Sequence, residues 1–128
     1  MVKIQREDFS ADEAIKKLKN PETGCIVTFL GLVRKFSLSK KEVDGVEFNY
    51  DEKMFKKLEE VEKKAVDNFD IKSVVILHRI GYLKVSEKIL LVAISSLHRE
   101  AAFKCCGFIM NEIKNIHRPW MKETIKKP

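Results

Sequence analysis

The spacing of apolar residues along the chain predicts three helices. Between residues 51 and 69 the apolar positions recur with a period of about 3.6 residues, and lysine and glutamate fill the opposite face. A longer helix is predicted from His98 to Ile116, because Pro119 prevents its extension. A short helix is predicted to begin at Ser10, whose hydroxyl forms a capping box with Glu13. The buried stripe of the longest helix is expected to consist of Ala102, Cys105, Cys106, Ile109, Ile113 and Ile116.

Runs rich in β-branched and aromatic residues predict the strands, which are expected at residues 2–7, 24–33, 46–50, 72–79 and 88–97. Residues 80–83 lie between the last two strands and are expected to add a further short strand or a turn. The segment from Gly24 to Val33 is almost wholly apolar, which is typical of a strand that is buried on both faces of a sheet.

The order of these elements, β-α-β-β-α-β-β-β-α, is typical of the α+β class. We expect a single domain over residues 1–128, in which a mixed and mostly antiparallel sheet has about three helices packed on it. A chain of 128 residues is long enough to bury one hydrophobic core. No repeat, linker or low-complexity segment divides it.

Composition narrows the class of protein. With 45% hydrophobic and 34% charged residues, the chain is expected to form an ordered, charge-rich globular protein. Its longest apolar run, residues 89–94, is far shorter than the roughly 20 residues that a membrane-spanning helix needs. The first eight residues include Glu7 and Asp8 and lack the apolar core of a secretory signal, so a cytoplasmic location without membrane attachment is expected.

The three cysteines and three histidines do not indicate a disulfide framework or a metal site. Cys105 and Cys106 are adjacent, no C-x-x-C pair occurs, and the histidines are scattered. We therefore expect ordinary buried thiols, no bound metal and no cofactor.

The charge balance is basic, because 25 Lys and Arg residues exceed 19 Asp and Glu residues by 6. A net charge of +6 is compatible with nucleic acid, an anionic small molecule or an acidic protein as partner. The lysines are spread along the whole chain rather than clustered with aromatic residues, so no nucleic acid is expected as partner.

Three groups of basic residues are candidates for the chemistry. Arg34 follows the second predicted strand, where a planar guanidinium suits phosphate recognition. His98 and Arg99 lie at the start of the longest helix, where free backbone amides attract anions and basic side chains are slightly unfavourable. Lys114 and Lys122 flank a tryptophan near the end of that helix, a setting that can lower the pKa of a lysine amine. Taken one at a time, each of these side chains is also compatible with a solvated surface position.

Four segments of the chain carry a resemblance to a known family. They read VTFLGLVR at residues 27–34, LHRIGYL at 77–83, SSLHREAAF at 95–103, and IK at 113–114 followed by PWMKE at 119–123. In this order and spacing they resemble the large-subunit family of molybdopterin synthase, collinearly from about Gly24 to Glu123.

The resemblance implies an α/β hammerhead-like fold and a sulfur-transferring enzyme of molybdenum-cofactor biosynthesis. In the family, a small ubiquitin-like subunit inserts its Gly-Gly tail, which carries a C-terminal thiocarboxylate, into a pocket of the large subunit. Sulfur passes in two rounds to cyclic pyranopterin monophosphate, which gives the dithiolene of molybdopterin. The family also implies that a homodimer of this chain forms the centre of a heterotetramer with the small subunit.

The resemblance implies roles for seven residues. By position, Lys114 resembles the central catalytic lysine of the family and Lys122 resembles the second one. Lys122 is aligned by its distance from Pro119, because the chain has one extra residue after Lys114. The residues that resemble binders of substrate and pocket lining are Arg34, His98, Arg99, Phe29 and Met110.

The predicted helix also bears on the oligomeric state. His98 and Lys114 are sixteen residues apart, which is about 24 Å at a rise of ~1.5 Å per residue. One straight helix cannot deliver both side chains to one substrate, so the helix breaks, the two residues serve different steps, or a second copy supplies one of them. We favour the second copy, since symmetric dimers are the commonest oligomers.

Two other functions are compatible with the sequence. The first is a small basic binding module without catalysis, for RNA or an acidic protein, whose binding to RNA would weaken with added salt. The second is a subunit that keeps the family's shape but has lost activity.

Overall fold

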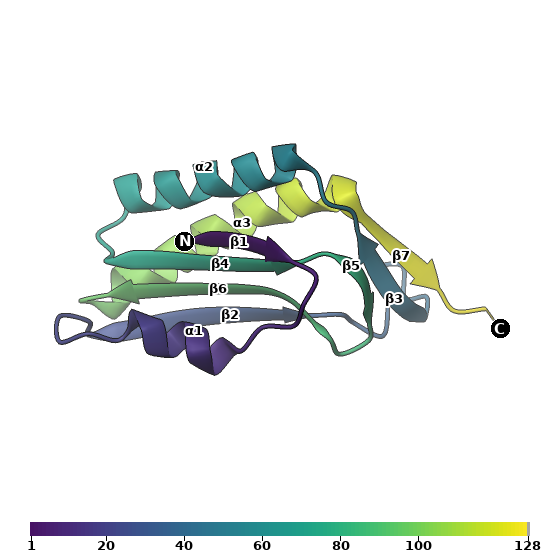
Figure 1. The fold of residues 1–128 in the computed structure, drawn as a ribbon, viewed down its shortest axis with the longest axis horizontal. Helices are drawn as coiled ribbons and strands as arrows, with labels where there is room; N and C mark the ends of the chain where they lie inside the picture. Colours follow the sequence, from purple (N-terminus) through teal and green to yellow (C-terminus); the bar gives the residue numbers. More distant parts are fainter. Residues whose placement is uncertain (128) are drawn as a thin grey trace.

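In the computed structural model, which describes residues 1–127, the chain forms two β-sheets and three α-helices (Figure 1). The strands are β1 Val2–Gln5, β2 Cys25–Leu32, β3 Val43–Phe48, β4 Ser73–Arg79, β5 Gly81–Lys84, β6 Lys88–Ser96 and β7 Met121–Ile125. The helices are α1 Ala11–Leu18, α2 Glu52–Asn68 and α3 Arg99–His117, and a short 3-10 turn, η1, covers Arg118–Trp120.

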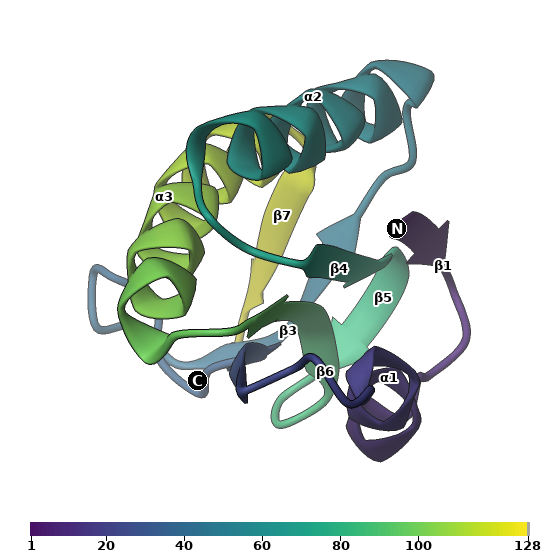
Figure 2. The same cartoon turned by 90° about the vertical axis from the view of Figure 1, so that its left-hand side faces the viewer.

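The larger sheet has the strand order β1-β4-β6-β2. Strand β1 runs parallel to β4, and the other two pairs are antiparallel. Helices α2 and α3 pack on one face, where Met54, Ile76 and Ile109 are fully buried, and α1 covers the opposite face around Leu91 (Figure 2). The predicted α+β class, with three helices on a mixed, mostly antiparallel sheet, is confirmed. The division of the helices between the two faces was not predicted.

Three strands form a second sheet, in the order β5-β3-β7, beyond one end of the larger sheet (Figure 1). Strand β7 was not predicted from the sequence. It follows η1 and pairs antiparallel with β3, so that Met121 lies opposite Phe48 and Glu123 lies opposite Val46. The segment after α3 thereby becomes a wall beside the end of that helix.

Side-chain caps fix where two of the helices begin. Ser10 Oγ accepts a hydrogen bond from the backbone N–H of Glu13 at 3.1 Å, which confirms the predicted start of α1. At the start of α2, the Asp51 carboxylate accepts a hydrogen bond from the backbone N–H of Lys53 at 2.8 Å. Each cap satisfies a donor that the first turn of a helix leaves unpaired.

Helix α3 buries most of the predicted stripe. Its fully buried residues are Ala102, Cys105, Ile109 and Ile113, whereas Cys106 and Ile116 are half-buried. Burial raises the pKa of the Cys105 thiol to about 11, with a smaller contribution from Cys106, so Cys105 is protonated and inert at neutral pH.

Strand β2 corrects one expectation. Its apolar sequence predicted a strand buried on both faces, but β2 pairs only with β6 and forms an edge of the larger sheet. Phe29, Leu30 and Leu32 are exposed by 39%, 41% and 47%. Within residues 1–127 these side chains stay partly exposed because β2 pairs with β6 alone, which is why the apolar pattern did not correspond to burial.

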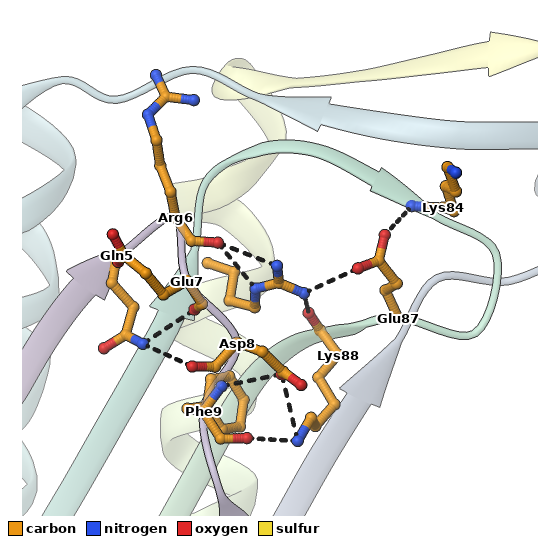
Figure 3. Close-up of polar contacts among 9 residues, drawn as sticks. Gln5, Arg6, Glu7, Asp8, Phe9, Lys84, Glu87 and Lys88 are labelled. Atoms are coloured by element: carbon orange, nitrogen blue, oxygen red, sulfur yellow. Dashed lines mark hydrogen bonds and ion pairs between the residues drawn. The ribbon is translucent and has the colours of Figure 1, made fainter.

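The buried Arg79 joins the two sheets through contacts with Arg6 and Glu87, two residues labelled in Figure 3. Arg79, the last residue of β4, donates from Nε and Nη2 to the backbone carbonyl of Arg6 at 3.2 and 3.0 Å. Its Nη1 donates to Glu87 Oε1 at 3.3 Å, and Glu87 Oε2 accepts from the backbone N–H of Lys84 at 2.6 Å. Because Lys84 belongs to β5, these contacts hold the smaller sheet against the end of the larger one.

Candidate active site

A cavity of about 770 Å³ lies where the two sheets and the end of α3 meet. Its lining comes from the second half of β2 and the residues after it, from β3, from the last turns of α3, and from β7. The residues used below are Phe29, Arg34, Met110, Lys114, His117, Arg118, Met121 and Glu123.

Four of the seven predicted site residues border this one cavity. Phe29 lies on β2 and Arg34 follows that strand, while Met110 and Lys114 lie four residues apart on α3. A spacing of four places two side chains on the same face of a helix. The structure therefore brings together residues from separate parts of the chain, and their individual roles remain predictions.

The cavity is electropositive. Its charged lining residues are three cations, Arg34, Lys114 and Arg118, and one carboxylate, Glu123. Among the ion pairs within residues 1–127, none involves these three cations. Unpaired cations in a concave site attract and orient an anionic ligand, because the low-dielectric walls focus their field.

His98 and Arg99 lie away from the cavity, at the opposite end of α3. His98 is the N-cap residue and makes no side-chain capping bond, and Arg99 is the first helical residue. Both side chains are exposed. Since α3 is continuous from Arg99 to His117, no break in the helix carries these two residues to the cavity of their own chain.

Lys122 also lies outside the cavity lining. Side chains alternate between the two faces of a strand, and Met121 and Glu123 of β7 face the cavity together with Phe48 and Val46 of β3. Lys122 pairs with Glu47 on the opposite face of the smaller sheet, and both are exposed. The side chain that enters the cavity next to Lys122 is therefore that of Met121.

A pair of histidines at the cavity wall was missed by the sequence reasoning. His78 of β4 is fully buried, and its Nε2 lies 3.4 Å from Nδ1 of His117, which borders the cavity. Phe48 packs against both rings, with centroid distances of 4.9 Å to His78 and 5.5 Å to His117. The two histidines are 39 residues apart in the chain, so no local pattern could have indicated the pair.

Comparison with known proteins gives the family. The family model described as MoaE protein matches residues 4–116. The chain belongs to the MoaE family. It is 40% identical over 118 residues to the molybdopterin synthase catalytic subunit of Pyrococcus abyssi, and the aligned region covers 92% of this chain and 80% of that protein. It is 36% identical over 123 residues to the corresponding subunit of Vibrio cholerae, and here the aligned region covers 95% of this chain and 82% of that protein.

The fold is also that of solved members of the MoaE family. The crystal structure of molybdopterin synthase from Staphylococcus aureus superposes with a TM-score of 0.86 at 28% identity, covering 98% of this chain and 91% of that one. The family predicted from the sequence is thus confirmed. The family also gives the enzyme class, a sulfurtransferase that is the catalytic subunit of molybdopterin synthase. This supports the catalytic function over the alternative of a non-catalytic binding module.

Two further features of this MoaE chain concern metals and membranes. Within residues 1–127, no three His, Cys, Asp or Glu side chains are grouped closely enough to hold a metal ion. Across the same residues, no helix combines the length and the apolar character needed to cross a membrane.

Proposed function

We propose that the cavity beside Lys114 is where sulfur is transferred from the C-terminal thiocarboxylate of a small ubiquitin-like subunit to cyclic pyranopterin monophosphate. The observation that carries this proposal is the convergence of Arg34, Lys114 and Arg118, without ionic partners among the described residues, on one concave site. A phosphorylated substrate and an anionic thiocarboxylate both need such a site.

In this proposal the cationic residues of the cavity bind the substrate and stabilise the charge that develops during sulfur transfer. Arg34 binds the phosphate through its planar guanidinium. The Lys114 ammonium stabilises the negative charge that develops at the acyl carbon during transfer, and this effect grows when the docked tail excludes water from the site. Two successive transfers to neighbouring carbons of the pterin give the dithiolene.

The apolar part of the cavity suits the tail of the small subunit. Phe29 and Met110 line the same cavity as Lys114, and in this proposal they form a narrow approach that admits glycine backbone but not larger side chains. We therefore place an extended Gly-Gly terminus along these two residues, with its thiocarboxylate next to Lys114.

The functional assembly in this proposal is a cytoplasmic heterotetramer with a homodimer of this chain at its centre. His98 and Arg99 lie too far along α3 to reach Lys114 of their own chain. The second copy of the chain supplies them to each cavity, where they add to the anion-binding charge.

The proposal is tested by reconstitution. The purified chain is mixed with a thiocarboxylated small subunit and cyclic pyranopterin monophosphate, and molybdopterin is measured after oxidation to a fluorescent derivative. Lys114→Ala should lose most dithiolene formation and still bind the small subunit. The matched control is Lys104→Ala on the same helix, which should be dispensable because Lys104 is not a lining residue of the cavity and pairs with Glu100 at 3.9 Å. Near-normal activity of Lys114→Ala would remove Lys114 from the mechanism.

A further inference from the structure

The hydrogen bonds of the histidine pair fix which nitrogen carries each proton. His78 Nδ1 lies 2.7 Å from the backbone carbonyl oxygen of Arg79, which only accepts, so this nitrogen is the protonated one. Burial, with a smaller contribution from His117, lowers the pKa of His78 to about 4. His78 is therefore neutral at neutral pH, and its Nε2 carries a lone pair.

The tautomer of His117 follows from that of His78. Since His78 Nε2 is an acceptor, His117 Nδ1 donates its N–H to it across 3.4 Å. Neutral His117 then has its own lone pair on Nε2. Protonation of His117 adds the proton at Nε2 and leaves the bond to His78 intact, so the ring keeps its orientation in both charge states.

The free nitrogen of His117 is accessible, and its side chain lies in the cavity wall. No side chain or backbone group of residues 1–127 hydrogen-bonds to His117 Nε2, and none of their buried side-chain nitrogen or oxygen atoms lacks a partner. Nε2 is consequently an accessible atom rather than a buried one. His117 is a lining residue of the cavity, so a bound ligand can reach it.

Burial and a neighbouring arginine favour the neutral form of His117. The ionisable side chains that share the cavity wall with it are Lys114 of α3, Arg118 of η1, Glu123 of β7 and Arg34 after β2, and His78 of β4 lies behind it. Burial first, and Arg118 second, lower the pKa of His117 below its usual value of 6.5. His117 is therefore in its neutral form at neutral pH, which is the form that can accept a proton.

We propose that His117 is a general base in sulfur transfer and that His78 is its positioning residue. The proposal rests on the function proposed above. Once sulfur has bonded to a pterin carbon, it is still bonded to the acyl carbon of the tail as a thioester. A water molecule adds to that acyl carbon and gives one proton to His117 Nε2. The carbon–sulfur bond of the acyl group then breaks, its electron pair stays on sulfur, and the tail leaves as a carboxylic acid that ionises to solvent.

The central test is His117→Asn. The asparagine amide keeps a donor toward His78 in place of Nδ1–H and has no group that takes a proton at the position of Nε2. We expect kcat to fall about 100-fold or more, as for loss of a general base, with little change in KM for cyclic pyranopterin monophosphate. Mass spectrometry should show the small subunit joined to the pterin as a thioester, accumulating within the first turnover.

The outcomes separate this inference from the proposed function. If the wild-type chain forms no molybdopterin, the proposed function itself fails. If the wild type is active and His117→Asn matches it in kcat, His117 is not the base. A variant that loses activity through a raised KM, without thioester accumulation, would show a role in substrate binding and also overturn the inference.

The positioning role of His78 has its own test. His78→Gln offers a carbonyl oxygen that can accept from His117, whereas His78→Phe keeps a ring against Phe48 but has no acceptor. We expect His78→Gln to retain most of kcat and His78→Phe to lose at least about tenfold, with thermal unfolding measured to confirm that both fold. Equal activities of two folded variants would refute the positioning role.

The pH profile identifies the base independently. Wild-type kcat should decline as pH falls through the lowered pKa of His117, below 6.5. This acid limb should disappear in His117→Asn and persist in Glu123→Gln, since Glu123 is the carboxylate on the cavity wall. An acid limb that is unchanged in His117→Asn would assign the base to another group.

Discussion

Mixed dimers test whether each active site combines Lys114 of one protomer with Arg99 of the other. Arg99 and Lys114 are fifteen residues apart on the continuous helix α3, which places them about 22 Å apart at a rise of ~1.5 Å per residue. A sphere with the cavity's volume of 770 Å³ would be only about 11 Å across. One chain therefore cannot place both side chains on one substrate.

The expected magnitude follows from counting sites. Arg99→Ala and Lys114→Ala are each expected to be inactive as homodimers. A heterodimer of the two has one cavity with both side chains intact and one cavity that lacks both. Random mixing gives about half heterodimers, each with half of its sites intact, so roughly a quarter of wild-type activity should return.

The assay co-expresses the two variants with different affinity tags, isolates the heterodimer by two successive purifications, and measures molybdopterin formation. Isolated heterodimer should reach about half of wild-type activity per chain. The matched negative control pairs Arg34→Ala with Lys114→Ala, two residues that border the same cavity of one chain. That mixture should stay inactive. A verified Arg99→Ala and Lys114→Ala heterodimer without activity would refute the shared site.

Three further predictions concern the tail, β7 and pH. Removing the two terminal glycines from the small subunit, with the thiocarboxylate on its new end, should abolish transfer, and equal transfer by that subunit would exclude the narrow approach. Lys122→Ala should lose less activity than Lys114→Ala if the outer face of β7 is not catalytic, and an equal loss would restore Lys122 to the reaction. The free energy of unfolding, measured by chemical denaturation, should fall by up to about 3 kcal/mol as pH drops from 6.5 to 4, because unfolded His78 binds a proton that the buried ring does not. In His78→Gln this decline should be smaller.

The helices could be predicted from the sequence because their signals are local. The capping box at Ser10, the apolar stripe of α2 and the stop before Pro119 each depend on residues within a few turns of one another. Strand β7 could not be predicted in the same way. It is five residues long and is stabilised by pairing with β3, more than seventy residues earlier in the chain.

The site could be predicted only in part. Arg34 and Lys114 were candidates from their residue type and position, Phe29 and Met110 from the family resemblance alone, and the fold brings all four to one cavity. The sequence could not show on which face of β7 Lys122 lies, because the register of β7 on β3 decides which side chains point toward the cavity. A shift of one residue would exchange the two faces.

Both the edge of the larger sheet and the cavity of the single chain lack something that a second protein chain could supply. Strand β2 presents Phe29, Leu30 and Leu32 to solvent along an unpaired sheet edge, an arrangement that natural proteins usually cover. The cavity at the end of the same strand lacks His98 and Arg99, the two basic residues that the family resemblance predicts to bind the anionic substrate. A second protein chain at this edge would bury the apolar side chains next to the cavity, and the homodimer and the small subunit of the proposed assembly are the two chains available. Only a second copy of this chain carries His98 and Arg99, so recovery of activity in mixed dimers would show that the second copy reaches the cavity.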